Sequence, residues 1–149
     1  MEVSGGGVIV PRPSSAVGRL FSAPAVLAPS RRSGKLGVYD EFIGSIAQEL
    51  RALGVVAEWS EPAGSRAWAA RRSADQVSLV VDLVIGVASN AAWQGLLAVL
   101  HRRGRQRIRA IVGSRVTEEA TERWVQVDGE AEAVANVLRD LNPWAGEGK

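Results

Sequence analysis

The sequence predicts an α+β fold in which a small antiparallel sheet packs on a long central apolar helix, with two amphipathic helices beside it. The central helix is predicted from residues 75–103, an almost unbroken run of helix-forming and small apolar residues. Apolar residues recur at helical spacing over 38–53 and 129–142, which indicates the two amphipathic helices. Apolar and polar residues alternate over 107–116 and 122–127, which indicates two strands of the sheet.

The first predicted helix ends at a glycine and leads into a short strand. Its apolar positions recur every three or four residues and are Phe42, Ile43, Ile46, Leu50 and Leu53. Gly54 follows, and glycine commonly ends a helix because it adopts the left-handed conformation without strain. Residues 55–60 then favour a strand, and Pro62 and Gly64 place the residues after it in a loop.

Two structures remain open for the long apolar run. On a helix of 3.6 residues per turn, Asp82, Ser89 and Trp93 fall on one narrow, mostly polar stripe, while apolar residues cover nearly all of the remaining circumference. Such a helix lies either at the centre of a small fold or across a membrane, and the uncharged window 83–100 only just reaches the length of a span. The polar stripe would face lipid in a lone span, which favours the central helix in water.

The C-terminal third is predicted to form a hairpin and a closing helix. The two alternating segments predicted as strands are close enough in sequence to pair antiparallel through a short connection. The helix over 129–142 has Asp128 as its candidate N-cap, and Pro143 ends it. Residues 143–149 are then a flexible tail.

Residues 1–35 differ in composition from the rest of the chain and are predicted to be a disordered basic tail. They are rich in proline, glycine and serine, and four prolines interrupt every apolar stretch (Pro11, Pro13, Pro24 and Pro29). Residues 1–37 carry a net charge of +4, so within a total of +2 the remaining chain carries −2. The predicted single domain, residues 36–142, therefore lacks the general basic surface of a nucleic-acid-binding protein.

The composition excludes several kinds of catalytic and metal chemistry. The chain has no cysteine, which rules out disulfides, thiolate catalysis and thiolate-bound zinc. It has a single histidine, His101, so a histidine-based metal site or catalytic triad within one chain is not expected. No serine, carboxylate or glycine-rich loop stands in the context of a catalytic or phosphate-binding motif. We therefore predict no enzymatic activity, no cofactor and no metal.

The candidate partner-binding residues lie on the polar stripe and in the arginine run that follows it. They are Asp82, Ser89, Trp93, Arg102, Arg103, Arg105, Arg107 and Arg109. The chain also has five tryptophans, and exposed tryptophan is typical of residues that anchor protein interfaces. The partner is expected to be another protein or a second copy of the chain. Arginine also binds phosphate, but three nearby acidic residues could neutralise the run, namely Glu118, Glu119 and Glu122.

Several segments resemble, in their order, a family of small bacterial proteins. They are AQELRALGVVAEW, a loop with EPAGS, a long apolar helix ending WQGLLAVLHRR, then RIRAIVG, WVQVDG and EAVANVLRDL. In this order they resemble the effector-associated constant component proteins of bacterial conflict systems, which are small α+β domains of actinobacteria and their relatives. The resemblance covers about residues 37–141 and rests on the order of elements and on the junction between the apolar helix and the arginines. The family's glycine-rich, often lysine-containing loop is here PAGSRAW, which departs from that pattern.

The resemblance implies an accessory or adaptor role beside an effector enzyme, with no catalysis by the chain itself. Together with the residues above, it predicts a cytoplasmic, non-enzymatic protein-interaction domain. Two alternatives remain open. One is a small single-pass inner-membrane protein with a helix over residues 78–100, and the other is an accessory factor that binds nucleic acid through Arg102 to Arg109.

Overall fold

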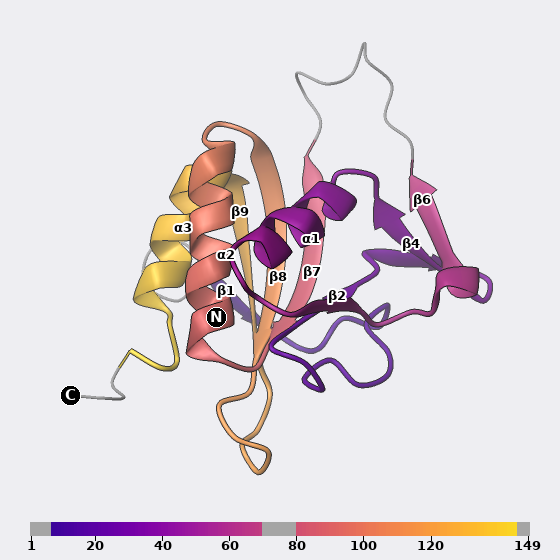
Figure 1. Ribbon diagram of the computed structural model, residues 1–149, viewed down its shortest axis with the longest axis horizontal. Helices are drawn as coiled ribbons and strands as arrows, with labels where there is room; N and C mark the ends of the chain where they lie inside the picture. Colours follow the sequence, from indigo (N-terminus) through magenta and orange to yellow (C-terminus); the bar gives the residue numbers. More distant parts are fainter. Residues whose placement is uncertain (1–6, 70–79, 146–149) are drawn as a thin grey trace.

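The computed structural model describes residues 7–69 and 80–145, and these residues form two β-sheets and three α-helices (Figure 1). The larger sheet has six strands in the order β1 (Val8–Val10), β9 (Arg123–Glu130), β8 (Arg107–Ser114), β7 (Val81–Val87), β2 (Ala25–Ala28) and β5 (Ala57–Trp59). The β7–β8 and β2–β5 pairs are parallel, and the other pairs of this sheet are antiparallel. The smaller sheet has the order β3 (Arg31–Ser33), β4 (Leu36–Asp40) and β6 (Arg66–Ala69), with a short 3₁₀ helix, η1 (Ala63–Ser65), before β6.

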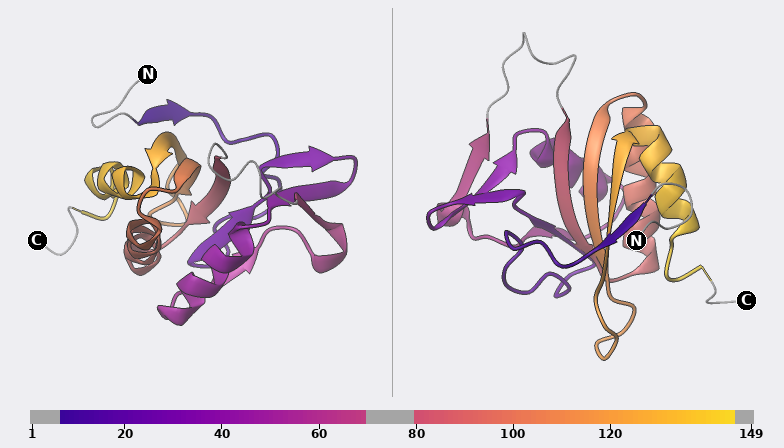
Figure 2. Two further views of the ribbon diagram at one scale, coloured as in Figure 1. Left: turned by 90° about the horizontal axis from the view of Figure 1, so that it is seen from above. Right: turned by 180° about the vertical axis from the view of Figure 1, so that it is seen from behind.

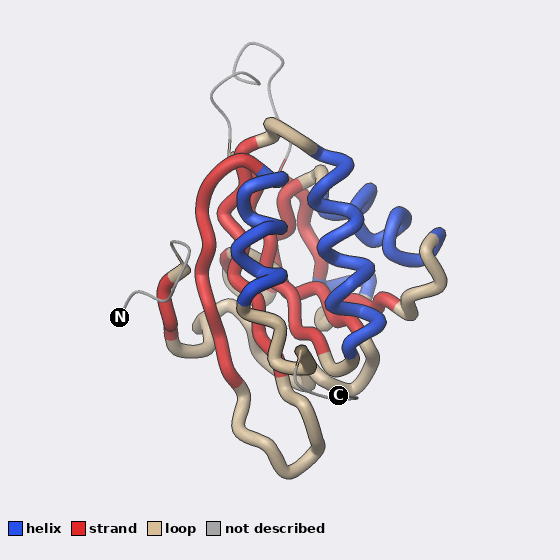
Figure 3. Tube along the Cα trace, turned by 90° about the vertical axis from the view of Figure 1, so that its left-hand side faces the viewer, coloured by secondary structure: helices blue, strands red, loops and turns tan. Residues whose placement is uncertain are grey.

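The three helices lie on one face of the larger sheet (Figure 3). They are α1 (Ile43–Ala52), α2 (Asn90–Arg103) and α3 (Ala131–Asp140). Their apolar residues and alternate residues of the strands form the main core, in which Leu83, Ile85 and Leu96 are fully buried. α2 connects β7 to β8, because two neighbouring parallel strands need a crossover of about a dozen residues or more between them.

Residues 10–24 cover part of the opposite face of the larger sheet, so there the sheet is the middle of three layers (Figure 2). Leu20 and Ala23 pack there in a second, smaller core with Val84 and Trp124. This differs from the disordered tail predicted for residues 1–35: β1, β2 and β3 all lie in it, although residues 1–6 lie outside the described residues. The prolines separate short apolar segments, and each strand among them pairs with a strand that is remote in sequence or, for β3, with β4 beyond residue 35, which a local pattern does not reveal.

The predicted long central helix over residues 75–103 is wrong, and so is the small antiparallel sheet predicted to pack on it. Residues 81–87 form β7, and α2 begins only at Asn90; residues 75–79 lie outside the described residues. Both faces of β7 are covered, so its apolar residues follow one another without alternation. Periodicity does not distinguish such a run from a buried helix, and the resulting sheet is mixed rather than antiparallel.

Other predicted elements agree more closely with the structure. The predicted hairpin is confirmed as β8 and β9, which pair antiparallel along their length. The predicted closing helix corresponds to α3, whose N-cap position is occupied by Glu130 rather than Asp128. The first predicted helix corresponds to α1, which begins at Ile43 because residues 38–40 belong to β4.

Within residues 7–69 and 80–145, no helix combines the length and the apolar character needed to cross a membrane. The alternative of a spanning helix over residues 78–100 does not agree with the structure, because that range contains β7 and the start of α2. Most apolar residues of β7 and α2 are buried in the two cores of the protein, and residues 78 and 79 lie outside the described residues.

Candidate functional site

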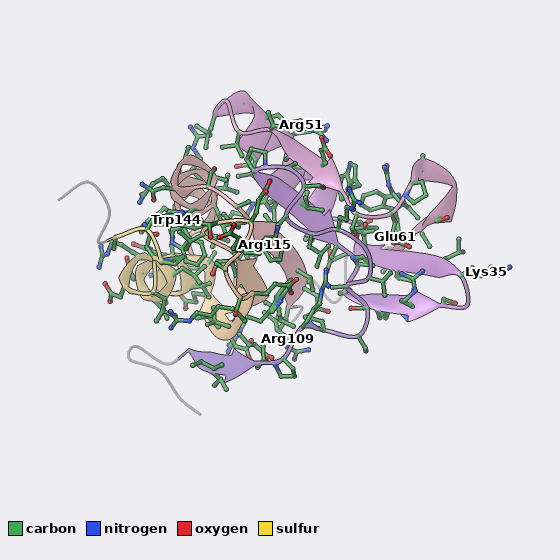
Figure 4. The ribbon with its side chains drawn as sticks, turned by 90° about the horizontal axis from the view of Figure 1, so that it is seen from below. Lys35, Arg51, Glu61, Arg109, Arg115 and Trp144 are labelled. Carbon is green, nitrogen blue, oxygen red and sulfur yellow. The ribbon has the colours of Figure 1, made fainter. Side chains whose placement is uncertain are left out.

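Trp93, the tryptophan of the predicted interaction surface, lies inside the protein. Its side chain is 1% exposed, and its indole Nε1 donates a hydrogen bond to the carbonyl oxygen of Leu138 at 3.0 Å. Trp144 packs against it with 6.0 Å between ring centroids, near the ends of α2 and α3 (Figure 4). Trp144 is buried too, which differs from the flexible tail predicted for 143–149, of which residues 146–149 lie outside the described residues. Trp93 therefore joins α2 to α3 and is not accessible to a partner.

Ser89 and Asp82 do not share a surface, because the residues between them form a strand rather than a helix. Ser89 is the N-cap of α2, where its Oγ accepts a hydrogen bond from the backbone N–H of Ala92 at 3.2 Å. Asp82 lies on the face of β7 that points away from the helices, with its Oδ1 3.6 Å from Nη1 of Arg109 on β8. The structure thus brings Asp82 and Arg109 together and separates both from Ser89.

The arginine run also divides between different parts of the fold. Its exposed members include Arg102, Arg105 and Arg107. Arg103 turns toward α1, where its Nη2 lies 2.5 Å from Oε2 of Glu49 and 2.6 Å from Oγ of Ser45. Its side chain is only 13% exposed, so Arg103 links α2 to α1 rather than binding a partner.

The two arginines of β8 face acidic residues on the neighbouring strands. In the register of the sheet, Arg109 lies between Asp82 and Asp128, and Arg107 lies opposite Glu130. Cross-strand pairs of opposite charge stabilise a sheet and compensate each other's charge. Acidic neighbours therefore offset these arginines, although they come from strands and not from the loop glutamates that we expected. Arg103 and Arg109 are thus engaged with carboxylates of the chain itself, and nucleic-acid binding through Arg102 to Arg109 stays a prediction.

Aromatic residues from three strands form a cluster at the smaller sheet. Centroid distances are 5.0 Å between Tyr39 and Trp59, 5.4 Å between Tyr39 and Trp68, and 5.3 Å between Trp59 and Trp68. Tyr39 and Trp68 are paired in the register of β4 and β6, and Trp59 ends β5 of the larger sheet. The guanidinium carbon of Arg66 lies 5.2 Å from the Trp59 ring centroid, which is a cation–π contact. We call Trp59, Arg66 and Trp68 the Trp68 surface.

Trp68 is 44% exposed and is the one exposed tryptophan among the residues that the structure describes. Beside it, Arg66 donates from Nε to the backbone oxygen of Glu61 at 2.7 Å, which holds the guanidinium over Trp59. The Glu61 carboxylate is buried and lies 2.9 Å from Nη2 of Arg32, so its charge is compensated within the sheet. The Trp68 surface therefore combines a large exposed ring with a net positive charge.

Tyr39 lies buried at the base of this cluster. Its hydroxyl donates to the backbone oxygen of Leu27 at 3.3 Å and lies 3.5 Å from Oγ of Ser60. Burial raises the pKa of Tyr39 above its ordinary value of 10.0, and this outweighs the hydrogen bond with Ser60, which acts in the other direction. The phenol is therefore neutral near pH 7, and its hydrogen bond joins the smaller sheet to β2.

Sequence reasoning did not find the Trp68 surface, because its residues come from separate strands. The alternation in RAWA is a signal for the strand β6, but Pro62 and Gly64 just before it favour a loop, which is what the sequence predicts there. Over the ranges that the structure describes, no three carboxylate or histidine side chains gather as a metal site.

Comparisons of the chain with protein-family models, with curated proteins and with solved structures found no match. The resemblance to the effector-associated constant component proteins therefore stays a prediction.

Proposed function

We propose that the chain is a non-enzymatic protein-interaction domain that acts as an adaptor, and that the Trp68 surface binds its partner. The observation that carries this proposal is the 44% exposure of Trp68 beside Arg66 on a short strand. Binding energy at protein interfaces concentrates on tryptophan, tyrosine and arginine, whose side chains offer a large contact area. Tyr39 and Trp59 pack against Trp68 from within, so the indole is held in place before a partner arrives.

The charge around Trp68 indicates the chemistry of the partner. Among the described residues, Arg66 has no carboxylate within ion-pair distance, and its guanidinium rests on an aromatic ring. Lys35 extends from the outer tip of the same sheet, in the turn between β3 and β4 (Figure 4). An acidic partner surface with an apolar pocket for the indole fits both features, because opposite charges increase the rate of encounter and select the partner.

The resemblance drawn from the sequence supplies the class of partner within this proposal. It is an effector enzyme of a bacterial conflict system, beside which the chain acts as an accessory component. A second copy of the chain is the competing partner, and the experiment below separates the two.

Site-specific photo-cross-linking tests the proposal. We expect a photoreactive phenylalanine derivative at position 68 to cross-link one protein in the host cell. The same residue at position 56 serves as the control, since Val56 is 56% exposed but is not part of the Trp68 surface and should not give this product. A product with twice the mass of the chain identifies self-association instead of an effector.

The partner identified by cross-linking is then purified, and the affinity of the chain for this partner is measured. Trp68→Ala should lower its affinity by about 30-fold or more, the change of about 2 kcal/mol that defines an interface hot spot. Val56→Ala should leave the affinity within about twofold, because isolated exposed apolar residues contribute little outside an interface. Equal affinities of the Trp68→Ala variant and the unchanged chain would remove the Trp68 surface from the proposal.

A further inference from the structure

A cavity of about 420 Å³ lies beside the loop between β8 and β9. Residues 18–22 of the N-terminal segment form one wall, and Arg12, Arg115, Glu118 and Glu122 complete it. A smaller cavity of about 290 Å³ adjoins it and shares three of its residues, Phe21, Arg115 and Glu118. Their lining includes residues 88 and 115–118, which follow the carboxyl ends of the parallel strands β7 and β8; these strands end toward the bottom of Figure 1. Open α/β sheets commonly bind ligands at the carboxyl ends of their strands.

Arg115 is held at the boundary between the two cavities. It follows the last residue of β8, and its backbone N–H donates to the carbonyl oxygen of Val87 at 3.3 Å. Its guanidinium carbon lies 5.5 Å from the ring centroid of Phe21. Phe21 in turn packs edge-on against Trp124, at 6.2 Å between centroids. Viewed from below in Figure 4, Arg115 lies near the middle of this edge of the molecule.

Two of the five charged groups in the larger cavity are already paired with each other. Arg12 donates to the carbonyl oxygen of Gly18 at 2.7 Å, and its Nη1 lies 3.6 Å from Oε2 of Glu122. Glu122 also accepts a hydrogen bond from the indole Nε1 of Trp124 at 2.9 Å. The Arg12–Glu122 pair therefore closes one side of the cavity and leaves no net charge there.

The remaining charges favour an anion. Within residues 7–69 and 80–145, no carboxylate lies within ion-pair distance of Arg19 or Arg115, and no acceptor is hydrogen-bonded to either guanidinium. Glu118 is the remaining acidic residue of the lining, so two arginines and one glutamate are left and their net charge is positive. A guanidinium presents several N–H donors in a plane, which matches the paired oxygens of a phosphoryl or carboxylate group.

We propose that this cavity binds a small organic ligand through an oxyanion group, phosphoryl or carboxylate, held by Arg19 and Arg115, with the Phe21 ring as its apolar wall. The volume is within the range of pockets for small molecules, about 300–1,000 Å³. The site goes beyond the proposed interaction function, because it uses none of the residues of the Trp68 surface. It gives the domain a small-molecule ligand in addition to a protein partner.

Arginine Nε–H resonances of the full chain, recorded by NMR, test this site. Phenyl phosphate and benzoate are the two probes, and phenol is the uncharged control. We expect saturable shifts at Arg19 and Arg115 with one or both anions and none with phenol. The anion that binds more tightly identifies the oxyanion as phosphoryl or carboxylate.

Arg115→Met should weaken binding of the preferred probe at least tenfold, whereas Arg102→Met, an exposed arginine outside the cavity, should leave it unchanged. Arg19 lies in an exposed loop, so Arg19→Met gives the same test if the Arg115→Met variant is too unstable to measure. The proposal fails if the shifts are spread equally over Arg102, Arg105 and Arg107, because the anions then associate with arginine in general. It also fails if both cavity variants bind as tightly as the unchanged chain.

Discussion

Gly86 and Gly113 are neighbours in the register of β7 and β8, and each leaves space that another part of the chain fills. A Cβ at Gly86 would collide with the backbone carbonyl oxygen of Leu20, and one at Gly113 would lie 2.6 Å from the ring of Trp124. The two glycines therefore form a flat strip on the sheet, and the smaller core is built on this strip. At the scale of single residues, the absence of a side chain determines how closely the N-terminal segment approaches.

We expect Gly86→Ala to destabilise the protein by about 1–3 kcal/mol, because the added methyl group forces apart two closely packed backbones. Urea denaturation followed by circular dichroism measures this change. Gly44→Ala is the matched control: nothing lies within 4 Å of a Cβ at that position in α1, so the change should be neutral or stabilising. Equal stability of the Gly86→Ala variant and the unchanged chain would contradict the close approach of Leu20.

Tyr39 is the single tyrosine of the chain, so its ionisation can be followed alone by ultraviolet absorbance. Because burial raises its pKa in the folded state, the folded protein keeps the phenolic proton at a pH at which the unfolded chain releases it. We expect the contribution of Tyr39 to stability to be complete below its ordinary pKa of 10.0 and to be lost as pH rises through the higher folded pKa. A titration midpoint at or below 10.0 in the folded protein would contradict this, and Tyr39→Phe should abolish the signal.

The N-terminal segment shows how an element can depend on a distant part of the chain for its structure. Leu20 has no regular secondary structure around it, yet its side chain is 1% exposed because it packs between Val84 and Trp124. The segment thus acts as a third layer, although its composition resembles that of a linker. Its order comes from burial on the sheet and not from local propensity.

Leu20→Ala should destabilise the protein by about 2–4 kcal/mol, the usual range for truncating a buried leucine. Val17 lies in the same segment, and its side chain is 45% exposed. Val17→Ala should therefore change the free energy of unfolding by less than about 0.5 kcal/mol. Thermal unfolding of the two variants measures the difference. Equal melting temperatures would mean that the segment does not pack on the sheet in solution.

In the molecule as a whole, the backbone is most completely shielded from solvent in the middle of the larger sheet. β7 and β8 each have a paired strand on both sides, α1 to α3 cover one face, and residues 10–24 cover part of the other. The smaller sheet has only three short strands, with Trp68 and Leu36 exposed on it. The fold thus joins a well-covered larger sheet to a more exposed smaller sheet. The proposed partner surface lies on the smaller sheet.

Hydrogen exchange followed by NMR should reflect this difference. We expect the amides of β7 and β8 to exchange slowest, at rates set by global unfolding, and those of β3 and β6 to exchange faster through local opening. Exchange of β6 at the same rate as β8 would show that the two sheets unfold as one unit.

The candidate site illustrates why residue types alone do not locate an interface. A surplus of tryptophan and arginine indicates an interface, but which tryptophan is exposed depends on the packing of elements. Trp93 falls on a polar stripe only if residues 75–103 form one helix. Once residues 81–87 are a strand, Trp93 points into the space between α2 and α3, and Trp68 remains accessible on β6.

An element with one buried and one solvated face can be predicted from the sequence, because its apolar and polar residues recur with the period of a helix or a strand. α1, α3 and the part of the β8–β9 hairpin around residues 107–110 and 125–128 are of this kind. The absence of cysteine chemistry also follows from the sequence alone, because no fold can alter composition. β7 and the N-terminal segment are different, since both faces of β7 are covered and the segment is ordered only by the sheet beneath it. Their structure depends on partners far away in the chain, so it arises only when the three layers assemble.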